Sequence, residues 1–349
     1  FEQYRYELDD GIRRGNLTPA FSMFNLYQIK ATTYLKRLLI ELNDRVAALN
    51  FTREESIALD AEDVEWATDE VMLSERNRQL LKNSVLSLKL AGKEHDDIIS
   101  TLKTRYTEQL NRLQQLNNED VFQVYINALA ELYDPHTNYF SPRNSENFNI
   151  NMRLSLEGIG AMLKREGEYV TIERLVTAGP AEKQGELQPN DKIVSVAQGE
   201  NAPVVDVVGW RLDEVVDLIR GEKGSTVVLG VLSEASATPN LTKKISIVRN
   251  TVKLEEQSAS KTVLEILHQD KLRKLGVISI PTFYIDFEGS RRGDPDYKST
   301  TRDVKKLIAE LKDEQVEGII IDLRGNGGGS LQEVNQLTGL FVERGPVVQ

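Results

Sequence analysis

The stretch Gly318-Ile-Ile-Ile-Asp-Leu-Arg-Gly-Asn-Gly-Gly-Gly-Ser330 decides how the last part of this 349-residue chain folds. Its three consecutive isoleucines suit a strand that is covered on both faces, as in a parallel sheet. A strand pattern at residues 274–281 and a helix pattern at 300–314 precede it, and a second helix pattern follows from Leu331 to about residue 340. The order strand, helix, strand, glycine turn, helix predicts a βαβ crossover unit.

The glycine turn that begins at Gly325 lies between a buried strand and a helix, so its backbone N–H groups can face a negative charge. Two interpretations compete, a phosphate cradle and an oxyanion hole. The turn has no lysine for a Walker loop, and Ser330 stands where a dinucleotide fingerprint needs its third glycine. Ser330 also lacks the Gly-x-Ser-x-Gly elbow of a nucleophile. A nucleotide-binding α/β enzyme is therefore the weakest of the alternatives.

Residues 148–250 have a different texture, with short strand patterns bounded by Gly, Pro and Asn. The patterns predict strands at residues 151–164, 169–174, 192–196, 226–232 and 243–248. One clear helix pattern, at residues 211–220, stops at Gly221. Several strands with one or two helices in about 100 residues indicate a small β-rich module.

The string Leu156-Glu-Gly-Ile-Gly-Ala-Met162 enters one of these strands. A Gly-hydrophobic-Gly turn exposes successive backbone N–H groups that can bind a carboxylate, and an exposed strand edge beside it can pair with an extended peptide. The helix at residues 211–220 offers four candidate pocket residues, Leu212, Val215, Val216 and Ile219. The alternative is a tight turn beside ordinary core residues.

Residues 1 to about 133 are expected to be helical. Apolar residues recur at helical spacing in two sets, which are Leu35, Leu38, Leu39, Leu42, Val46 and Leu49, and then Ile99, Leu102, Tyr106, Leu110, Leu113 and Leu116. Packing explains this pattern, so a scaffold is expected. A helix capped by residues 118–120 should end the region, and residues 134–142 should form a connection in which His136 is a loop histidine. Residues 286–298 should form a charged, mobile loop.

Composition excludes several classes of protein. The 43 Lys and Arg against 54 Asp and Glu give a net charge of −11, which argues against a nucleic-acid partner. Cysteine is absent and only three histidines occur, so neither a disulfide nor a metal centre is expected. No apolar run reaches the ~18 residues that a transmembrane helix needs. The chain starts in a helical pattern at Phe1 without an initiator Met or a visible signal peptide, and we expect it to be a fragment of a longer protein.

Four strings in residues 157–221 resemble a PDZ domain. They are Glu157-Gly-Ile-Gly-Ala161, Ala178-Gly-Pro-Ala-Glu182, Leu187-Gln-Pro-Asn-Asp-Lys-Ile193 and Leu218-Ile-Arg-Gly221. Domains of this kind bind free protein C-termini. The resemblance implies that Gly158, Ile159 and Gly160 form the carboxylate-binding turn and that Ala161 begins the strand that pairs with the peptide.

The same module is followed by Gly276-Val-Ile-Ser-Ile-Pro281 and Ile321-Asp-Leu-Arg-Gly-Asn-Gly-Gly-Gly329, and preceded by Asp134-Pro-His-Thr-Asn-Tyr-Phe140. In this order the strings resemble the C-terminal-processing, or tail-specific, protease family, and the helical start is similar to that of its large Gram-negative periplasmic member. The resemblance implies a multidomain α+β protein. We expect a helical domain at residues 1–147, a PDZ-like domain at 148–250, and the first part of a ClpP- or crotonase-like α/β protease core at 251–349.

The resemblance also implies an activity. The family consists of serine endopeptidases with a Ser-Lys dyad, which would lie beyond this chain, so the chain alone should be inactive. Gly328 or Gly329 would donate an N–H group to the oxyanion, with no metal or other cofactor. The implied substrates are proteins with unstructured apolar C-termini, including cell-wall enzymes, and a lipoprotein adaptor is the implied partner. The implied location is the periplasm, with the inner-membrane face as a place of association. The alternative is a non-catalytic scaffold that binds C-termini.

Overall fold

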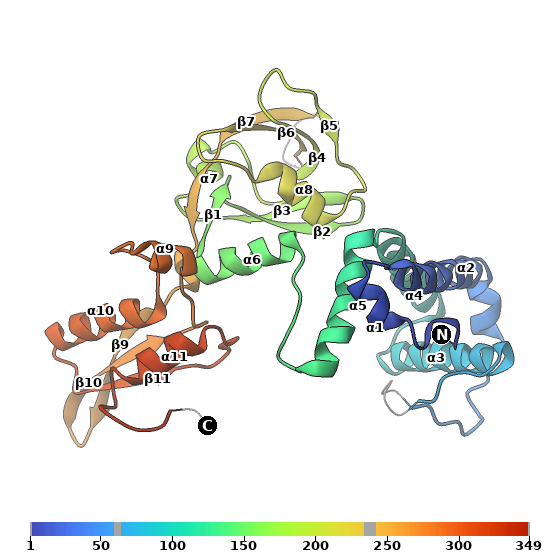
Figure 1. Cartoon of the computed structure of the whole chain (residues 1–349), viewed down its shortest axis with the longest axis horizontal. Coiled ribbons are helices and arrows are strands. Elements are labelled where there is room, and N and C mark those ends of the chain that lie inside the picture. Colours follow the sequence, from blue (N-terminus) through green and yellow to red (C-terminus); the bar gives the residue numbers. More distant parts are fainter. Residues whose placement is uncertain (1, 59–63, 234–241, 348–349) are drawn as a thin grey trace. The chain divides into compact units, whose positions relative to one another are not determined.

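The computed structural model describes residues 2–58, 64–233 and 242–347. The chain divides into two compact units, Phe1–Ser141 and Pro142–Gln349 (Figure 1). The first is helical, whereas the second combines antiparallel sheets, a parallel strand pair and helices. The multidomain α+β architecture predicted from the sequence is thereby confirmed. Each unit is described by itself.

The first unit consists of α1 (Leu8–Arg13), α2 (Thr18–Ala47), α3 (Glu70–Leu90), α4 (His95–Gln114) and α5 (Asn118–Tyr133), after a short 3-10 turn at Glu2–Tyr4. Helices α2, α3 and α4 contact one another and bury a common core. The predicted stripe on α2 is confirmed, because Leu35, Leu38, Leu42 and Val46 are all buried. Asn117, one residue earlier than predicted, caps α5 in a reciprocal capping box with Asp120.

The second unit opens with a helix that the sequence did not predict. Residues Pro142–Arg153 form α6, so the strand expected over residues 151–164 is wrong at its start. Arg143 explains the difference, because it pairs with Asp213 and Asp217 and fixes α6 through contacts distant in sequence. The strands themselves are β1 (Ser155–Gly158) and β2 (Ala161–Glu166).

A small β-rich module follows, as the sequence predicts. Its sheet has the order β2-β3-β4-β6-β7, with β5 paired to β4, and β1 pairs separately with β8. The elements are β3 (Tyr169–Leu175), α7 (Pro180–Gln184), β4 (Lys192–Ala197), β5 (Val205–Asp206), α8 (Leu212–Ile219), β6 (Thr226–Leu232), β7 (Lys243–Val248) and β8 (Asn250–Lys253). Strand β2 is an edge of the sheet, and α8 contacts it.

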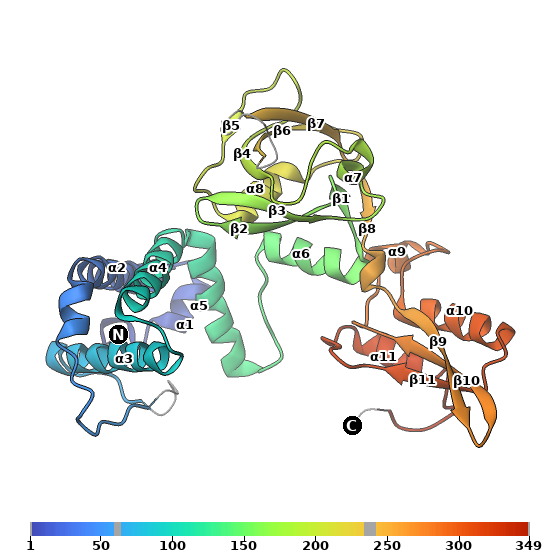
Figure 2. The same ribbon diagram turned by 180° about the vertical axis from the view of Figure 1, so that it is seen from behind.

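The last part of the chain confirms the crossover predicted from its isoleucine run (Figure 2). After a 3-10 turn at Glu255–Gln257 come β9 (Ser260–His268), β10 (Lys271–Ser279), α9 (Phe287–Arg292), α10 (Thr300–Asp313), β11 (Gly318–Asp322) and α11 (Leu331–Thr338). Strand β10 pairs in parallel with β11 and antiparallel with β9, and α10 and α11 pack on the sheet. The sequence did not predict β9.

Two further observations concern the whole of the described chain. The segment 286–298, predicted to be a mobile loop, contains the short helix α9, whose N-cap Asp286 accepts a hydrogen bond from Gly289. Within residues 2–58, 64–233 and 242–347, no helix combines the length and the apolar character needed to cross a membrane.

Candidate functional site

The glycine turn after β11 is held against the segment that continues β10. The amide nitrogen of Asn326's side chain donates to Ile280 O (2.8 Å), and Phe283 N donates to Gly328 O (2.8 Å). Ser330 N donates back to Phe283 O (2.8 Å), so Gly329 sits in a parallel bridge opposite Phe283. The turn is therefore an extension of the parallel β10–β11 pair rather than a free loop.

Of the amides from Gly325 to Ser330, those of Gly325 and Gly329 donate no hydrogen bond within the described residues. Asn326 N donates to Leu323 O, Gly327 N to Pro281 O and Ser330 N to Phe283 O. The N–H of Gly328 donates to the side chain of Asn326, two residues earlier, at Oδ1 (2.7 Å).

From residue 326 to residue 330, only the Gly329 amide donates no hydrogen bond within the described chain. Of the two predicted oxyanion donors, Gly329 is thus the one whose N–H is available, and its residue is exposed.

Position 329 also requires a glycine for steric reasons. Its φ angle is +138°, and a Cβ atom there would lie 2.3 Å from Phe283 O. Any side chain would push the turn away from the strand that holds it. The residue whose N–H group is available is therefore also a residue at which only glycine fits.

The start of the turn is fixed by an ion pair. Asp322, the last residue of β11, accepts hydrogen bonds from Arg324 through Nε (2.9 Å), Nη2 (2.7 Å) and the backbone N–H (3.0 Å). These hydrogen bonds lower the pKa of Asp322 to about 2. Asp322 is consequently a carboxylate at neutral pH and orders the entry into the turn.

The second candidate is the turn between β1 and β2, where the predicted Gly158, Ile159 and Gly160 lie together. The carbonyl of Ile159 accepts from Ala181 N (2.8 Å), and that of Gly160 accepts from Val176 N (2.8 Å). The amides of Ile159 and Gly160 donate no hydrogen bond within the described residues, although both residues are buried. A buried amide without a hydrogen-bond acceptor costs free energy unless a ligand or a water molecule accepts a hydrogen bond from it.

Gly158 differs from its two neighbours. It lies opposite Asn250 in the β1–β8 pair. The hydrogen bond from Leu254 N to Leu154 O shows that residues 154 and 254 form a hydrogen-bonded pair, and the register places Gly158 and Asn250 four residues farther along. In an antiparallel pair the hydrogen-bonded positions alternate, so Gly158 falls in a bonded pair with Asn250. Its amide faces β8, which leaves two of the three predicted amides unpaired.

Gly160 is the second position where glycine is required. Its φ angle is +73°, and a Cβ atom would lie 3.1 Å from Gly179 Cα and 3.3 Å from Val252 Cγ2. The left-handed conformation, together with this close approach, excludes a side chain. The turn is therefore held in one shape by packing on its inner side.

The predicted peptide-pairing strand begins at Ala161. Since Gly160 and Val176 form a bonded pair, the next pair, Ala161 and Leu175, is a non-bonded one. The N–H and C=O groups of Ala161 then point away from β3, and among the described residues no other strand lies beside β2 in this sheet. This edge is open to a further strand.

The four candidate pocket residues on α8 fall into two groups. Val215 and Ile219 are buried in the core of the module, with 0% and 4% of their surface exposed. Leu212 and Val216, one helical turn apart, are only half-buried. On β2 the side chain of Leu163 is also half-buried, a position that the sequence analysis did not single out.

Two arginines at this module were also missed. Arg249, 2% exposed, donates to Ile219 O, Leu218 O and Gln198 Oε1 and so binds the last carbonyls of α8. Arg220 follows α8, and its Cγ would lie 3.8 Å from a Cβ atom at Gly158. Burial lowers the pKa of both guanidinium groups. A single buried arginine leaves no periodic pattern by which the sequence could reveal it. Arg220 does occur in the string Leu218-Ile-Arg-Gly221, which contributes to the resemblance to a PDZ domain.

Ser330 and His136 both take part in local backbone structure. Ser330 is the N-cap of α11, where its hydroxyl accepts a hydrogen bond from Glu333 N (3.3 Å). His136 lies in an exposed turn, and its backbone N–H donates to Asp134 Oδ1 (3.1 Å). The hydroxyl of Thr137 and this N–H lower the pKa of Asp134.

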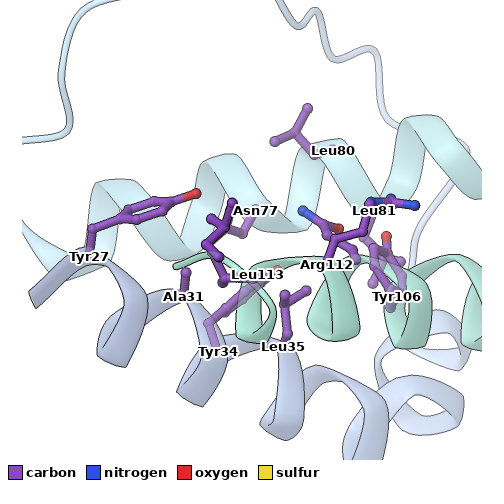
Figure 3. A pocket seen from close by; sticks show the side chains of 12 residues that line it. Tyr27, Ala31, Tyr34, Leu35, Asn77, Leu80, Leu81, Tyr106, Arg112 and Leu113 are labelled. Carbon is purple, nitrogen blue, oxygen red and sulfur yellow. The ribbon is translucent and has the colours of Figure 1, made fainter. Parts of the chain in front are cut away.

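The helical unit contains a separate cavity of about 460 Å³ between α2, α3 and α4 (Figure 3). Three tyrosines, Tyr27, Tyr34 and Tyr106, share its wall with leucines and with Arg112. Burial raises the pKa of Tyr34 and Tyr106, which therefore remain neutral phenols. No carboxylate or histidine is among the described residues that line this cavity.

Within the residues that the structure describes, no group of three or more His, Asp or Glu side chains is arranged to hold a metal ion.

Comparison with known proteins shows what the chain is similar to. Three families match consecutive segments: the tail specific protease N-terminal domain over residues 1–143, the PDZ domain over 147–232 and peptidase family S41 over 274–349. The Tail-specific protease of Haemophilus influenzae is 36% identical over 351 residues, which is 100% of this chain and 47% of that protein. The Carboxy-terminal processing protease CtpB of Bacillus subtilis is 30% identical over 258 residues, 73% of this chain and 47% of that protein.

The chain spans about half the length of these curated relatives. Among solved structures, the PDZ domain of a carboxy-terminal protease from Vibrio cholerae in complex with peptide is 48% identical, with a TM-score of 0.27. That match covers 29% of this chain and 100% of that one. The photosystem II D1 C-terminal processing protease is 23% identical with a TM-score of 0.33, over 71% of this chain and 59% of that one.

Proposed function

The chain belongs to the tail-specific, or C-terminal-processing, protease family, and we propose on that premise that it is the N-terminal and central part of a serine endopeptidase selective for protein C-termini. In this proposal the second unit captures the C-terminal tail of a substrate protein and presents the polypeptide to the catalytic centre. The observation that carries the proposal is the pair of glycine turns with unpaired amides, one at Ile159 and Gly160 and the other at Gly329.

The tail binds as an additional strand. Its terminal carboxylate accepts hydrogen bonds from the amides of Ile159 and Gly160, and its backbone pairs with the open edge of β2 from Ala161 onward. Leu212 and Val216 of α8 contact apolar side chains of the tail. The nearby positive charge of Arg220 favours an anionic terminus over a neutral one. The ligand is accordingly an unstructured tail with apolar final residues and a free carboxylate.

Hydrolysis follows acyl transfer. In the family's Ser-Lys dyad, which we place beyond residue 349, the serine oxygen attacks the scissile carbonyl carbon while its proton passes to the neutral lysine amine. The lysine then protonates the leaving amine, and water hydrolyses the resulting serine ester. The Gly329 amide donates to the carbonyl oxygen as that oxygen becomes negative. A donor at this place is worth about 3 kcal/mol of transition-state stabilisation.

The location and partners belong to the same proposal. We place the protein in the periplasm at the inner-membrane face, where a lipoprotein adaptor delivers substrates that include cell-wall enzymes. A domain that binds C-termini joined to a peptidase core suits such delivery, because the tail can be held while the core cuts elsewhere along the polypeptide.

The test uses the full-length protein and one unstructured reporter protein with an apolar tail, prepared either with a free C-terminus or as the C-terminal amide. We expect cleavage of the free form and at least tenfold slower cleavage of the amide, because the amide loses the charge that the turn binds. The chain of residues 1–349 alone should cleave neither. Equal rates for the two forms, or no cleavage by the full-length protein, would reject the proposal.

A further inference from the structure

Glu333 is a fully buried acidic residue to which the proposed mechanism gives no part. It lies in the first turn of α11, four residues after Gly329, and 0% of its surface is exposed. Its Oε2 atom accepts two hydrogen bonds, from Ser299 Oγ (2.8 Å) and from Thr301 N (2.7 Å). Its other oxygen, Oε1, is buried and has no hydrogen-bond partner among the described residues.

A buried carboxyl group with one oxygen that accepts no hydrogen bond destabilises the folded state. Burying an acidic group without an ion pair costs free energy, and leaving one of its oxygens unsatisfied adds to that cost. A leucine of similar size would avoid both penalties, although it could not accept the two hydrogen bonds. Glu333 therefore gives the fold something other than packing, namely an acceptor that ties α11 to the start of α10.

That tie leads to the glycine turn through a series of hydrogen bonds. Thr300, between the two donors to Glu333, exchanges hydrogen bonds with the backbone of Tyr284: Tyr284 N donates to Thr300 Oγ1 (2.7 Å) and Thr300 N donates to Tyr284 O (3.0 Å). The preceding residue, Phe283, is the one that pins Gly328 O and Ser330 N. The segment that braces the turn is thus itself braced by Glu333.

A second, shorter link reaches the turn from the other side. Glu333 N donates to Ser330 Oγ at the N-terminus of α11, and Glu333 O accepts from Thr301 Oγ1 (3.1 Å). The backbone and the side chain of Glu333 therefore join the end of the glycine turn to the start of α10, and Thr300 connects the start of α10 to the extension of β10. Displacing any of these segments would turn the Gly329 amide.

We propose that Glu333 is a positioning residue, whose buried carboxyl group fixes the direction of the Gly329 N–H by tying the start of α10 to α11. The proposal rests on the proposed function, since it assumes that Gly329 serves the oxyanion. Glu333 does not touch the substrate. It acts on the rate of the chemical step and leaves tail binding at β2 and α8 unaffected.

The test compares variants of the full-length protein. Glu333→Leu removes the acceptor, and a small displacement of a catalytic group can cost about 100-fold in rate. We expect kcat to fall by about 10-fold to 100-fold while KM stays within about twofold. Glu333→Gln keeps a carbonyl oxygen for Ser299 and Thr301 and should retain kcat within about threefold.

A transition-state mimic gives a second readout. A peptide aldehyde becomes an oxyanion when the serine adds to it, whereas the matching peptide alcohol does not. The inhibition constant of the alcohol divided by that of the aldehyde should therefore be smaller in Glu333→Leu than in the unmodified protein. The same ratio should stay unchanged in Glu333→Gln. The matched control is Leu337→Ala, which removes a buried contact one turn along α11 and should lower the melting temperature but keep kcat and the ratio.

If Glu333→Leu fails to fold, Ser299→Ala decides, because it cuts the same link from its partner and should lower kcat by about threefold to tenfold. Unchanged kcat in the variants that cut the link, equal losses in Glu333→Leu and Glu333→Gln, or an equal kcat loss in Leu337→Ala would each overturn the positioning role. An inactive wild-type protein would instead reject the proposed function.

Discussion

Gly328 and Gly329 have the same side chain and adjacent places in one turn, yet only one of them has an available amide. The amide of Gly328 is consumed by Asn326 Oδ1, whereas that of Gly329 is unpaired in the described chain. The sequence could place both residues in a glycine turn after a buried strand. It could not separate them, because the distinction depends on where the side chain of Asn326 folds back.

Gly329→Ala should abolish most activity in the full-length protein. A Cβ atom would meet Phe283 O at 2.3 Å, so the turn must move and the amide must turn with it. We expect kcat to fall at least about 100-fold, as for loss of one oxyanion donor. Gly327→Ala is the control, because nothing lies within 4 Å of its Cβ position and its φ angle is not positive, so its kcat should stay near that of the unmodified protein. A Gly329→Ala variant with full kcat would contradict the assignment.

Asp322 gives the turn a dependence on pH. The hydrogen bonds from Arg324 lower its pKa to about 2, from an unfolded value near 4. A lowered pKa means that the folded state favours the carboxylate, so its contribution is complete above about pH 4 and is lost as the pH falls toward 2. In Asp322→Asn the free energy of unfolding should therefore change less with pH over that window.

Urea titrations of the chain between pH 2 and pH 5 measure this difference. Asp313→Asn, at the exposed end of α10, serves as the control for the loss of one carboxylate. An Asp322→Asn variant whose stability follows pH as steeply as the unmodified chain would show that the Arg324 contact contributes nothing to folding.

At the scale of elements, α8 depends on a residue that lies 30 positions after it. Arg249 donates hydrogen bonds to the carbonyls of Leu218 and Ile219, which no further turn of α8 can satisfy, and its positive charge lies at the negative end of the helix. Helix α8 supplies Leu212 and Val216 to the proposed tail-binding surface. The place of that surface therefore depends on a buried cation.

Arg249→Met should destabilise the chain by about 3 kcal/mol, since several buried hydrogen bonds to a charged group are lost together. It should also weaken binding of a tail peptide, because the end of α8 is released. Arg174→Met, which removes an exposed arginine paired with Glu256, should change stability by less than about 0.5 kcal/mol. Denaturant unfolding and calorimetry measure both effects, and equal stability of the two variants would contradict the role of Arg249.

The elements also show where sequence patterns reach their limit. The three isoleucines of β11 and the amphipathic stripe of α2 predicted their elements correctly. Residues that a regular element buries are apolar, and they appear in the sequence as an apolar run or at a regular spacing. Helix α6 was predicted in part as a strand, since its position depends on the pairing of Arg143 with two aspartates of α8. Strand β9 escaped prediction because much of it is exposed and therefore shows no clean alternation.

At the scale of the whole molecule, the order of the parts was the most predictable property. Four short strings identified the PDZ-like module, and the string at 321–329 identified the peptidase segment that follows it. What the sequence could not give was which amides remain unpaired. Which amides are unpaired depends on the hydrogen bonds that form in the folded structure. Gly158 is an example, because its place opposite Asn250 in the β1–β8 pair cannot be read from the sequence.

The account as a whole depends on recognition of a terminal anion by the amides of Ile159 and Gly160. Isothermal titration calorimetry of the 1–349 chain with a short peptide that ends in Ala-Ala measures this directly, when the free acid is compared with its C-terminal amide. We predict that the acid binds at least about tenfold more tightly, a difference of about 1.4 kcal/mol. Equal affinity of the two peptides, or no binding of either, would contradict the central claim.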